Sequence, residues 1–280
     1  MGAVNPPSTT WQLNDGQPLP VIGFGTYPHR GDDSQVTTAH ALEAGYRLLD
    51  TALRYGNEAA VGRPVAASGL DRDDILITTK VPGRHHGYDE TIKALRESLD
   101  NLGTDRVELY LIHWPLPRID RYVDTWRALI ELREQGLARS IGVSNFTEEH
   151  LRRIIDETGV VPAVNQVELH PHFPQQQLRA VHAELGILTE SWSPLGRGGL
   201  LGEPAIGEIA QAHLVSPAQV VLRWHLQLGV VPIPMSADAQ RQRQNLDVFG
   251  FTLTEQEMAT LSGMQRGRMN DQDPDVYEEF

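Results

Sequence analysis

Four polar side chains stand at or just after the ends of short apolar runs in the first half of the chain. They are Asp50, Tyr55, Lys80 and His113. Asp50 and Lys80 each end such a run, His113 directly follows one, and Tyr55 comes five residues after Asp50. Each alone has an ordinary explanation as a cap, a rim residue, a solvated charge or a packing histidine. If the runs are parallel strands of one barrel, however, all four side chains point into one mouth.

A tyrosine beside a lysine can donate a proton to an oxygen that gains negative charge, such as that of a carbonyl under reduction. A free phenol has a pKa of about 10, and an ammonium about 4 Å away contributes roughly 4 kcal/mol at an effective dielectric of about 20. We therefore expect Lys80 to lower the pKa of Tyr55 by about 3, toward the pH at which proton transfer is most useful. Asp50 would keep Lys80 charged, and His113 would hydrogen-bond the carbonyl oxygen.

Eight short apolar runs alternate with longer amphipathic stretches along the chain. The runs are Val21–Gly25, Tyr46–Asp50, Ile75–Lys80, Val107–Ile112, Ser140–Val143, Ala163–Val167, Ile187–Glu190 and Val230–Ile233. This alternation predicts parallel strands joined by helices. Eight such units fit an α/β fold of the (β/α)8 TIM barrel type, with residues 1–280 as one domain. The rival is an open doubly wound sheet, which usually carries G-x-G-x-x-G after its first strand. The segment Gly23–Tyr27 lacks the third glycine.

Several segments lie outside this repeat. Asn14–Gln17, between short apolar runs, predicts an N-terminal β-hairpin that could plug the barrel floor. Pro194–Leu228, between the seventh and eighth strands, predicts a Gly-rich loop followed by two helices. Residues 1–10 are expected to be a flexible leader. Residues 264–280 are expected to be a tail that either covers the substrate pocket or is disordered.

The composition narrows the function classes. The formal net charge of −13 disfavours nucleic acid and anionic membrane surfaces as partners. The absence of cysteine excludes disulfides and thiolate metal sites, and the adjacent His85 and His86 lack the spacing of a metal site. We expect no metal. No signal peptide and no membrane-length apolar run is visible, so a cytoplasmic location is expected. The protein is also expected to be a monomer. Five acids in the last ten residues predict a solvated tail.

The segments around the four side chains resemble the signatures of the aldo-keto reductases, most closely the diketogluconate reductase-like and prostaglandin F synthase-like subgroup. The matching motifs are Gly45–Ala52 leading to Tyr55–Glu58, Tyr110–Pro115, Ile141–Phe146, and Asn165–Glu168 followed by His170-Pro171. They occur in the family's order over about residues 11–262. The resemblance implies a nicotinamide-dependent oxidoreductase that reduces aldehydes and ketones to alcohols. Its catalytic tetrad would be Asp50, Tyr55, Lys80 and His113, with Tyr55 as the general acid.

The resemblance also implies a cofactor site. Ser144, Asn145 and Gln166 would hold the nicotinamide carboxamide, and Trp192 would stack on its ring. The glycines of Ser193–Gly198 would let the backbone approach the pyrophosphate. The full set of expected cofactor contacts is Gly25, Thr26, Asp50, Ser144, Asn145, Gln166, Trp192, Ser193, Pro194, Leu195, Gly196, Gly198, Ser236, Arg241, Gln244 and Asn245.

One motif departs from the family. Met235 stands where a lysine usually faces the 2′-phosphate of NADPH. Ser236 and Arg241 remain, and an arginine can both stack on adenine and bind phosphate. We therefore expect NADPH as the preferred cofactor, less strongly than in relatives, with NADH as a weaker alternative.

A small or medium carbonyl compound is the expected substrate, because aromatic walls suit such a ligand. The expected substrate contacts are Tyr27, Tyr55, His113 and Trp114, with Tyr277 as a candidate lid. Two other functions stay open. A nicotinamide-binding, redox-sensing partner subunit could retain the tetrad. A Schiff-base aldolase could use Lys80, although the neighbouring Asp50 opposes the lowered lysine pKa which that chemistry needs.

Overall fold

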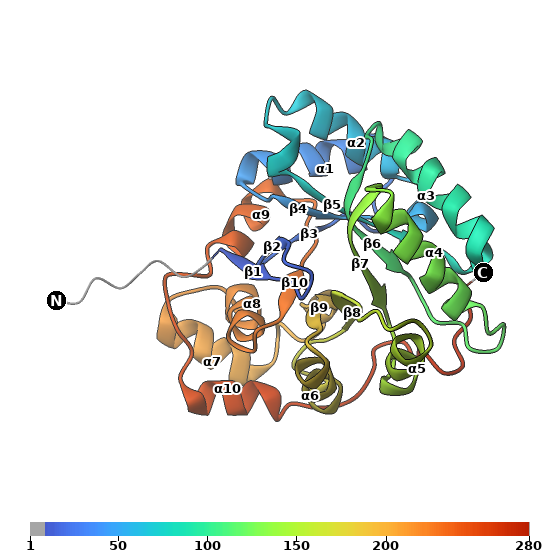
Figure 1. Ribbon diagram of the computed structural model, residues 1–280. Helices are drawn as coiled ribbons and strands as arrows, with labels where there is room; N and C mark the ends of the chain where they lie inside the picture. Colours follow the sequence, from blue (N-terminus) through green and yellow to red (C-terminus); the bar gives the residue numbers. More distant parts are fainter. Residues whose placement is uncertain (1–8, 280) are drawn as a thin grey trace.

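A barrel of parallel strands surrounded by helices makes up the protein (Figure 1). The structure, a computed structural model, describes residues 9–279. The expected leader over residues 1–10 therefore lies, except for its last two residues, outside the described part of the chain. Residues 10–12 already form a strand.

Eight strands form the barrel sheet in sequence order, and every neighbouring pair is parallel. They are β3 (Phe24–Gly25), β4 (Leu48–Asp50), β5 (Leu76–Val81), β6 (Val107–Ile112), β7 (Ala138–Ser144), β8 (Val164–Glu168), β9 (Leu188–Trp192) and β10 (Val231–Ile233). Backbone hydrogen bonds of 3.0 Å from Gly23 to Pro232 and from Gly25 to Pro234 connect the first strand to the last. The predicted (β/α)8 barrel is confirmed.

Helices cover the outside of the sheet. They are α1 (Gly31–Ala44), α2 (Glu58–Ala67), α3 (Tyr88–Leu102), α4 (Tyr122–Glu134), α5 (Glu148–Thr158), α6 (Gln176–Leu185), α7 (Pro204–His213), α8 (Pro217–Gln227), α9 (Ala239–Leu246) and α10 (Glu255–Ser262). Short 3₁₀ turns are η1 (Leu53–Tyr55), η2 (Arg72–Asp74), η3 (Gly83–His85) and η4 (Gly196–Gly198). The predicted insertion between the last two barrel strands holds η4, α7 and α8, so its two helices are confirmed.

The sequence of α3 shows why these helices form and where they stop. Leu95, Leu99 and Leu102 recur at helical spacing and are buried against the sheet. Gly103 ends the helix with a φ of 67°. A glycine adopts this left-handed conformation without strain, and its backbone N–H can then close the last turn.

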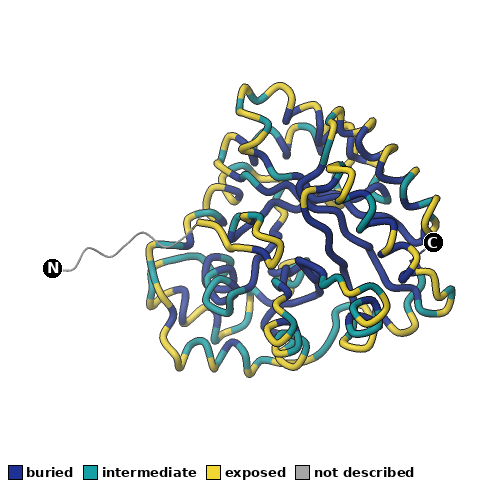
Figure 2. The backbone as a smooth tube through the Cα atoms, in the orientation of Figure 1, coloured by how far each residue is buried: buried dark blue, intermediate teal, exposed yellow. Residues whose placement is uncertain are grey.

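The hydrophobic core has two main layers, one between sheet and helices and one inside the barrel. Buried residues follow the strands, whereas exposed residues lie on the outer faces of the helices (Figure 2). In the inner layer, Leu48, Leu109 and Val231 pack together with Leu13 and Leu19. The last two belong to the hairpin of β1 (Thr10–Gln12) and β2 (Pro18–Pro20): Leu13 directly follows β1 and Leu19 lies in β2. The hairpin therefore closes one end of the barrel, as the sequence predicted.

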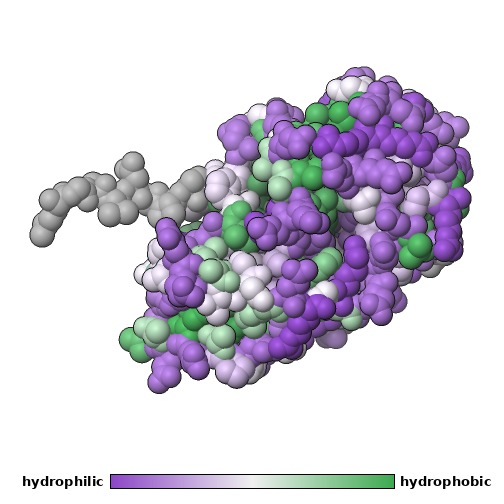
Figure 3. Space-filling model, turned by 90° about the horizontal axis from the view of Figure 1, so that it is seen from below, coloured by the Kyte–Doolittle hydropathy of each residue, from purple (hydrophilic) through white to green (hydrophobic). Residues whose placement is uncertain are grey.

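The outer surface is mostly hydrophilic on the face shown in Figure 3, with smaller apolar areas between the polar ones. Large exposed apolar side chains on the described residues include Tyr27 and Met235, both from segments with an expected role in binding. No helix within residues 9–279 has the length and apolar character needed to cross a membrane.

Candidate active site

The four predicted catalytic side chains come from three neighbouring strands and the turn after one of them. Asp50 ends β4, Lys80 lies one residue before the end of β5, and His113 directly follows β6. Tyr55 ends η1, the turn that follows β4. Because the strands are parallel and adjacent, these side chains gather at the carboxyl ends of the strands.

Asp50 and Lys80 form a buried ion pair. Lys80 Nζ donates to both carboxylate oxygens of Asp50 at 2.7 Å and to the backbone oxygen of Thr51 at 2.9 Å. Burial alone would lower the pKa of Lys80, but the charge of Asp50, with Tyr55 and a hydrogen bond to Asp50, raises it overall. Lys80 is therefore an ammonium at working pH, which opposes the Schiff-base chemistry that needs a free amine.

The Tyr55 ring lies between Lys80 and His113. Lys80 Nζ is 5.4 Å from the centre of the Tyr55 ring, and the His113 ring is 5.7 Å from it in an edge-to-face arrangement. The expected lowering of the Tyr55 pKa is wrong. Burial raises this pKa to about 12, and Asp50 and Glu279 add to the rise, whereas Lys80 acts in the expected direction but is outweighed. Tyr55 is therefore a protonated phenol over the whole working pH range.

Two further aromatic side chains that were expected to contact substrate, Tyr27 and Trp114, lie beside Tyr55 and directly after His113. The Tyr27 ring, 54% exposed, lies 5.0 Å from that of Tyr55. Trp114 is buried and packs against Tyr277, with ring centres 4.4 Å apart. A residue of the C-terminal tail thus covers Trp114.

The tail reaches His113 itself, a contact that the sequence did not indicate. Glu279 Oε1 lies 2.7 Å from His113 Nδ1, at angles that are not those of a hydrogen bond. The expectation of a wholly solvated acidic tail is therefore wrong for Glu279, which is 2% exposed, although Asp271 and Asp275 are exposed. The backbone N–H of Met269 also donates to Glu168, at 2.7 Å, and so ties the tail to the end of β8.

The expected carboxamide contacts form one connected polar group. Ser144 Oγ donates to the backbone oxygen of Gln166 at 2.7 Å, and Asn145 Nδ2 donates to Ser144 Oγ at 3.1 Å. The Trp192 indole N–H donates to Asn145 Oδ1 at 2.8 Å. Trp192 is half-buried, so part of its ring is exposed at this mouth. Hydroxyl and amide groups beside an aromatic face suit a planar amide ligand, so this donor set fits a nicotinamide.

Gln166 connects the Ser144–Asn145–Trp192 group to a second buried acid, Glu190, which was not expected from the sequence. Its side-chain N–H₂ donates to Asp50 at 2.8 Å and to Glu190 Oε2 at 2.9 Å. Burial and the charge of Asp50 raise the pKa of Glu190 to about 8. The signal for Glu190 in the sequence is its position at the end of the apolar run Ile187–Glu190. An acid at such a position is usually a cap.

The remaining expected cofactor residues lie on neighbouring loops of the same mouth. Thr26 is buried and its hydroxyl donates to the backbone oxygen of Asp50 at 3.0 Å, directly after the buried Gly25. The loop after β9 runs through Ser193, Pro194, Leu195, Gly196 and Gly198, and Pro194 is its only buried member of these five.

After β10, Met235 is 37% exposed and Ser236 precedes α9. On α9, Arg241 and Gln244 are exposed whereas Asn245 is buried. The side chain of Arg241 makes no ion pair within residues 9–279. An exposed guanidinium at this place has room to meet an anionic group.

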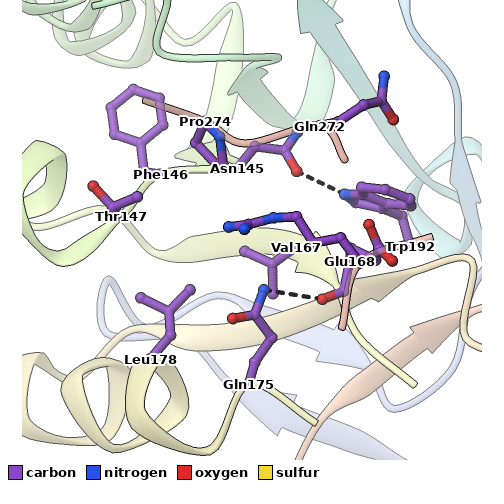
Figure 4. Close-up of a pocket in the computed structure, with 11 residues that line it drawn as sticks. Asn145, Phe146, Thr147, Val167, Glu168, Gln175, Leu178, Trp192, Gln272 and Pro274 are labelled. Atoms are coloured by element: carbon purple, nitrogen blue, oxygen red, sulfur yellow. Dashed lines mark hydrogen bonds between the residues drawn. The ribbon is translucent and has the colours of Figure 1, made fainter. Parts of the chain in front are cut away.

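A cavity lies beside the expected carboxamide contacts Asn145 and Trp192, between β8, α6 and the tail (Figure 4). Asn145, Trp192 and Glu168 contribute to its walls, and Gln272 and Pro274 of the tail complete them. The tail thus borders the expected nicotinamide contacts as well as His113. Among the described residues, no group of three or more histidine, aspartate or glutamate side chains could hold a metal ion.

Comparisons with known proteins agree with this geometry. The model of the Aldo/keto reductase family matches residues 10–266. The 2,5-diketo-D-gluconic acid reductase B of Corynebacterium sp. (strain SHS752001) is 57% identical over 272 residues, which cover 97% of this chain and 98% of that protein. An aldo-keto reductase of Mycobacterium sp. (strain KMS) is 50% identical over 95% of this chain and 96% of its own length.

Solved structures show the same relationship. A variant of Gox0644 in complex with NADPH superposes with a TM-score of 0.92 at 46% identity, over 96% of this chain and 98% of that one. An aldo/keto reductase from Brucella melitensis gives a TM-score of 0.89 at 46% identity, over 91% of this chain and 99% of that one. With a family model matched over nearly its whole length, the chain belongs to the aldo/keto reductase family.

Proposed function

We propose that the protein reduces aldehydes or ketones with NADPH and that Tyr55 is the general acid. The observation that carries this proposal is the buried Asp50–Lys80 pair, whose ammonium lies 5.4 Å from the centre of the Tyr55 ring at the mouth of the barrel. Membership of the family and the NADPH named with one structural neighbour support the cofactor.

The chain's own residues have distinct parts in this reaction. Lys80, held charged by Asp50, stabilises the phenolate that forms as Tyr55 gives up its proton. His113, whose ring is 5.7 Å from that of Tyr55, orients the carbonyl oxygen toward the phenol. When bound, reduced nicotinamide supplies the hydride, and Ser144, Asn145, Gln166 and Trp192 would hold it.

Tyrosine substitution tests the proposal directly. The Tyr55→Phe variant should oxidise NADPH about 10²–10⁴-fold more slowly than the parent, because it removes a positioned proton donor. The carbonyl substrates in this panel of assays are diketones, sugar-derived ketones, methylglyoxal and aromatic aldehydes. Diketogluconate is included because one relative is named a 2,5-diketo-D-gluconic acid reductase. Tyr88→Phe is the control, since Tyr88 is exposed at the start of α3.

The same measurements separate the alternatives. An active Tyr55→Phe variant would refute the acid role. A parent protein that binds NADPH but turns over none of the panel would favour the redox-sensing subunit. The monomeric state and the cytoplasmic location expected from the sequence stay predictions.

A further inference from the structure

The last described residue, Glu279, brings a carboxylate to the catalytic histidine. Its Oε1 lies 2.7 Å from His113 Nδ1 and 3.2 Å from Arg54 Nε. Its Oε2 accepts a hydrogen bond of 3.2 Å from the backbone N–H of Gly83. Three positive or donor groups, from the segments after three successive strands, thus surround one side chain that is 2% exposed.

The surrounding structure is built to receive this segment. A Cβ on residue 83 would lie 2.5 Å from the backbone oxygen of Glu279, so only a glycine lets the tail come this close. Two residues earlier, Tyr277 packs on the buried Trp114. An aromatic pair of this kind stabilises the docked tail beyond the area it buries. The carboxylate is therefore held in place by packing as well as by charge.

Glu279 carries a negative charge at the mouth of the barrel. Burial alone would raise the pKa of this carboxyl, but His113, Gly83 and Arg54 hold it below its usual value, so the side chain is an anion. The one arginine that approaches it, Arg54, is paired with it, and its Oε1 also faces His113 Nδ1. Nearby His86 is neutral at working pH, because burial lowers its pKa to about 4.

A substrate carboxylate that enters beside His113 would therefore meet a fixed anion whose neighbouring cation, Arg54, is already paired with it. Like charges in contact at a binding site cost several kcal/mol and suppress the wrong partner. An uncharged carbonyl compound meets no such repulsion. It can still reach the Tyr55 phenol and the aromatic wall formed with Tyr27.

We propose that Glu279 is a specificity-determining residue that makes this site favour uncharged carbonyl substrates over those carrying a carboxylate next to the reacting carbon. The inference rests on the proposed function, since it concerns the substrate of the same site. It assigns to the C-terminal tail a part in substrate choice and not in the chemical step.

Ethyl pyruvate and pyruvate test this inference, because they share a reacting ketone and differ in charge. The parent should prefer the ester in kcat/KM. In Glu279→Gln, kcat/KM for pyruvate should rise about tenfold or more, because one like-charge contact is removed. The value for the ester should change by a smaller factor than that for pyruvate, because the ester carries no charge for Glu279 to repel. Glu278→Gln is the matched control, because Glu278 is more exposed and its only ion pair within residues 9–279, with Arg118, spans 3.9 Å.

Arg54→Gln provides the opposite perturbation. It leaves Glu279 in place and removes one paired cation, so kcat/KM for pyruvate should fall relative to the ester. Two variants that shift one ratio in opposite directions cannot both be explained by a loosened tail. Equal losses for both substrates in Glu279→Gln would instead show that Glu279 only positions His113, and would overturn the inference. An unchanged ratio in that variant would overturn it as well.

A binding measurement separates this inference from the proposed function. Oxamate is a carboxylate related to pyruvate that is not reduced, and its binding can be followed by tryptophan fluorescence. It should bind Glu279→Gln about tenfold more tightly than the parent, for the same electrostatic reason. Equal binding to both proteins refutes the inference, whatever the turnover assays show.

Discussion

Replacing Glu190 by glutamine should remove a loss of folding stability that grows as the pH rises. Glu190 lies fully buried on β9, and among the described residues only its Oε2 has a hydrogen-bond partner, the Gln166 side chain. Its pKa of about 8 lies well above its ordinary 4.5, mainly because burial disfavours the charged form. A glutamine has nearly the same shape and can accept the same hydrogen bond from Gln166 without ever carrying a charge.

The sign of the effect follows from proton linkage. An acid whose pKa is higher in the folded than in the unfolded state binds its proton more tightly when folded. The fold carries no penalty from Glu190 below about pH 4.5, and the penalty grows as the pH rises to about 8. Between pH 5 and pH 8 the change is at most about 4 kcal/mol, from about 1.4 kcal/mol per pH unit.

The assay is the free energy of unfolding in urea at several pH values from 5 to 8. The stability of Glu190→Gln relative to the parent should rise by about 2–4 kcal/mol across this range, whatever constant cost the new amide group brings. Glu208→Gln, at an exposed position on α7, controls for general charge effects. A relative stability of Glu190→Gln that is the same at pH 5 and pH 8 would refute the reasoning.

Two further substitutions probe packing and cofactor choice. Gly62→Ala should destabilise the fold by about 3 kcal/mol or more, because overpacking displaces backbone. The new alanine Cβ would lie 2.0 Å from the backbone oxygen of Leu102, where α2 meets α3. Urea unfolding beside Gly207→Ala, whose Cβ has open space, measures this, and equal stabilities would contradict it. Met235→Lys should raise the preference for NADPH over NADH about tenfold, by one added cation near a phosphate. Kinetics with both cofactors measure this, and an unchanged ratio would show that Met235 does not face the 2′-phosphate.

The barrel could be predicted from the sequence because its signals are local. Each of the eight apolar runs overlaps a strand of the barrel sheet. Runs of four to six apolar residues between helical patterns are typical of strands buried on both faces. The same local signals place Asp50, Lys80 and His113 at strand ends, where a closed barrel must bring them together.

A tail over the substrate pocket was one of two alternatives from the sequence, but the contact of Glu279 with His113 could not be predicted in this way. Gly83 and Glu279 are 196 residues apart in sequence. Nothing in the composition of an acidic C-terminal segment distinguishes the one buried carboxylate from its solvated neighbours. The decisive feature is the close approach at Gly83, which becomes visible only once the chain is folded.

The expected pKa of Tyr55 is wrong for a different reason, which bears on the proposed role of this residue as a general acid. Burial and two acids that the fold places nearby, Asp50 and Glu279, outweigh the one favourable charge of Lys80. With a pKa of about 12, only about one Tyr55 in 10⁵ is ionised at pH 7. An alkoxide, about as basic as the hydroxide formed from water of pKa 15.7, still takes the phenol proton readily. Alcohol oxidation would need the scarce phenolate as its base. Burial and the acids Asp50 and Glu279 therefore keep the Tyr55 phenol protonated at neutral pH, which is the state that its proposed role as general acid requires.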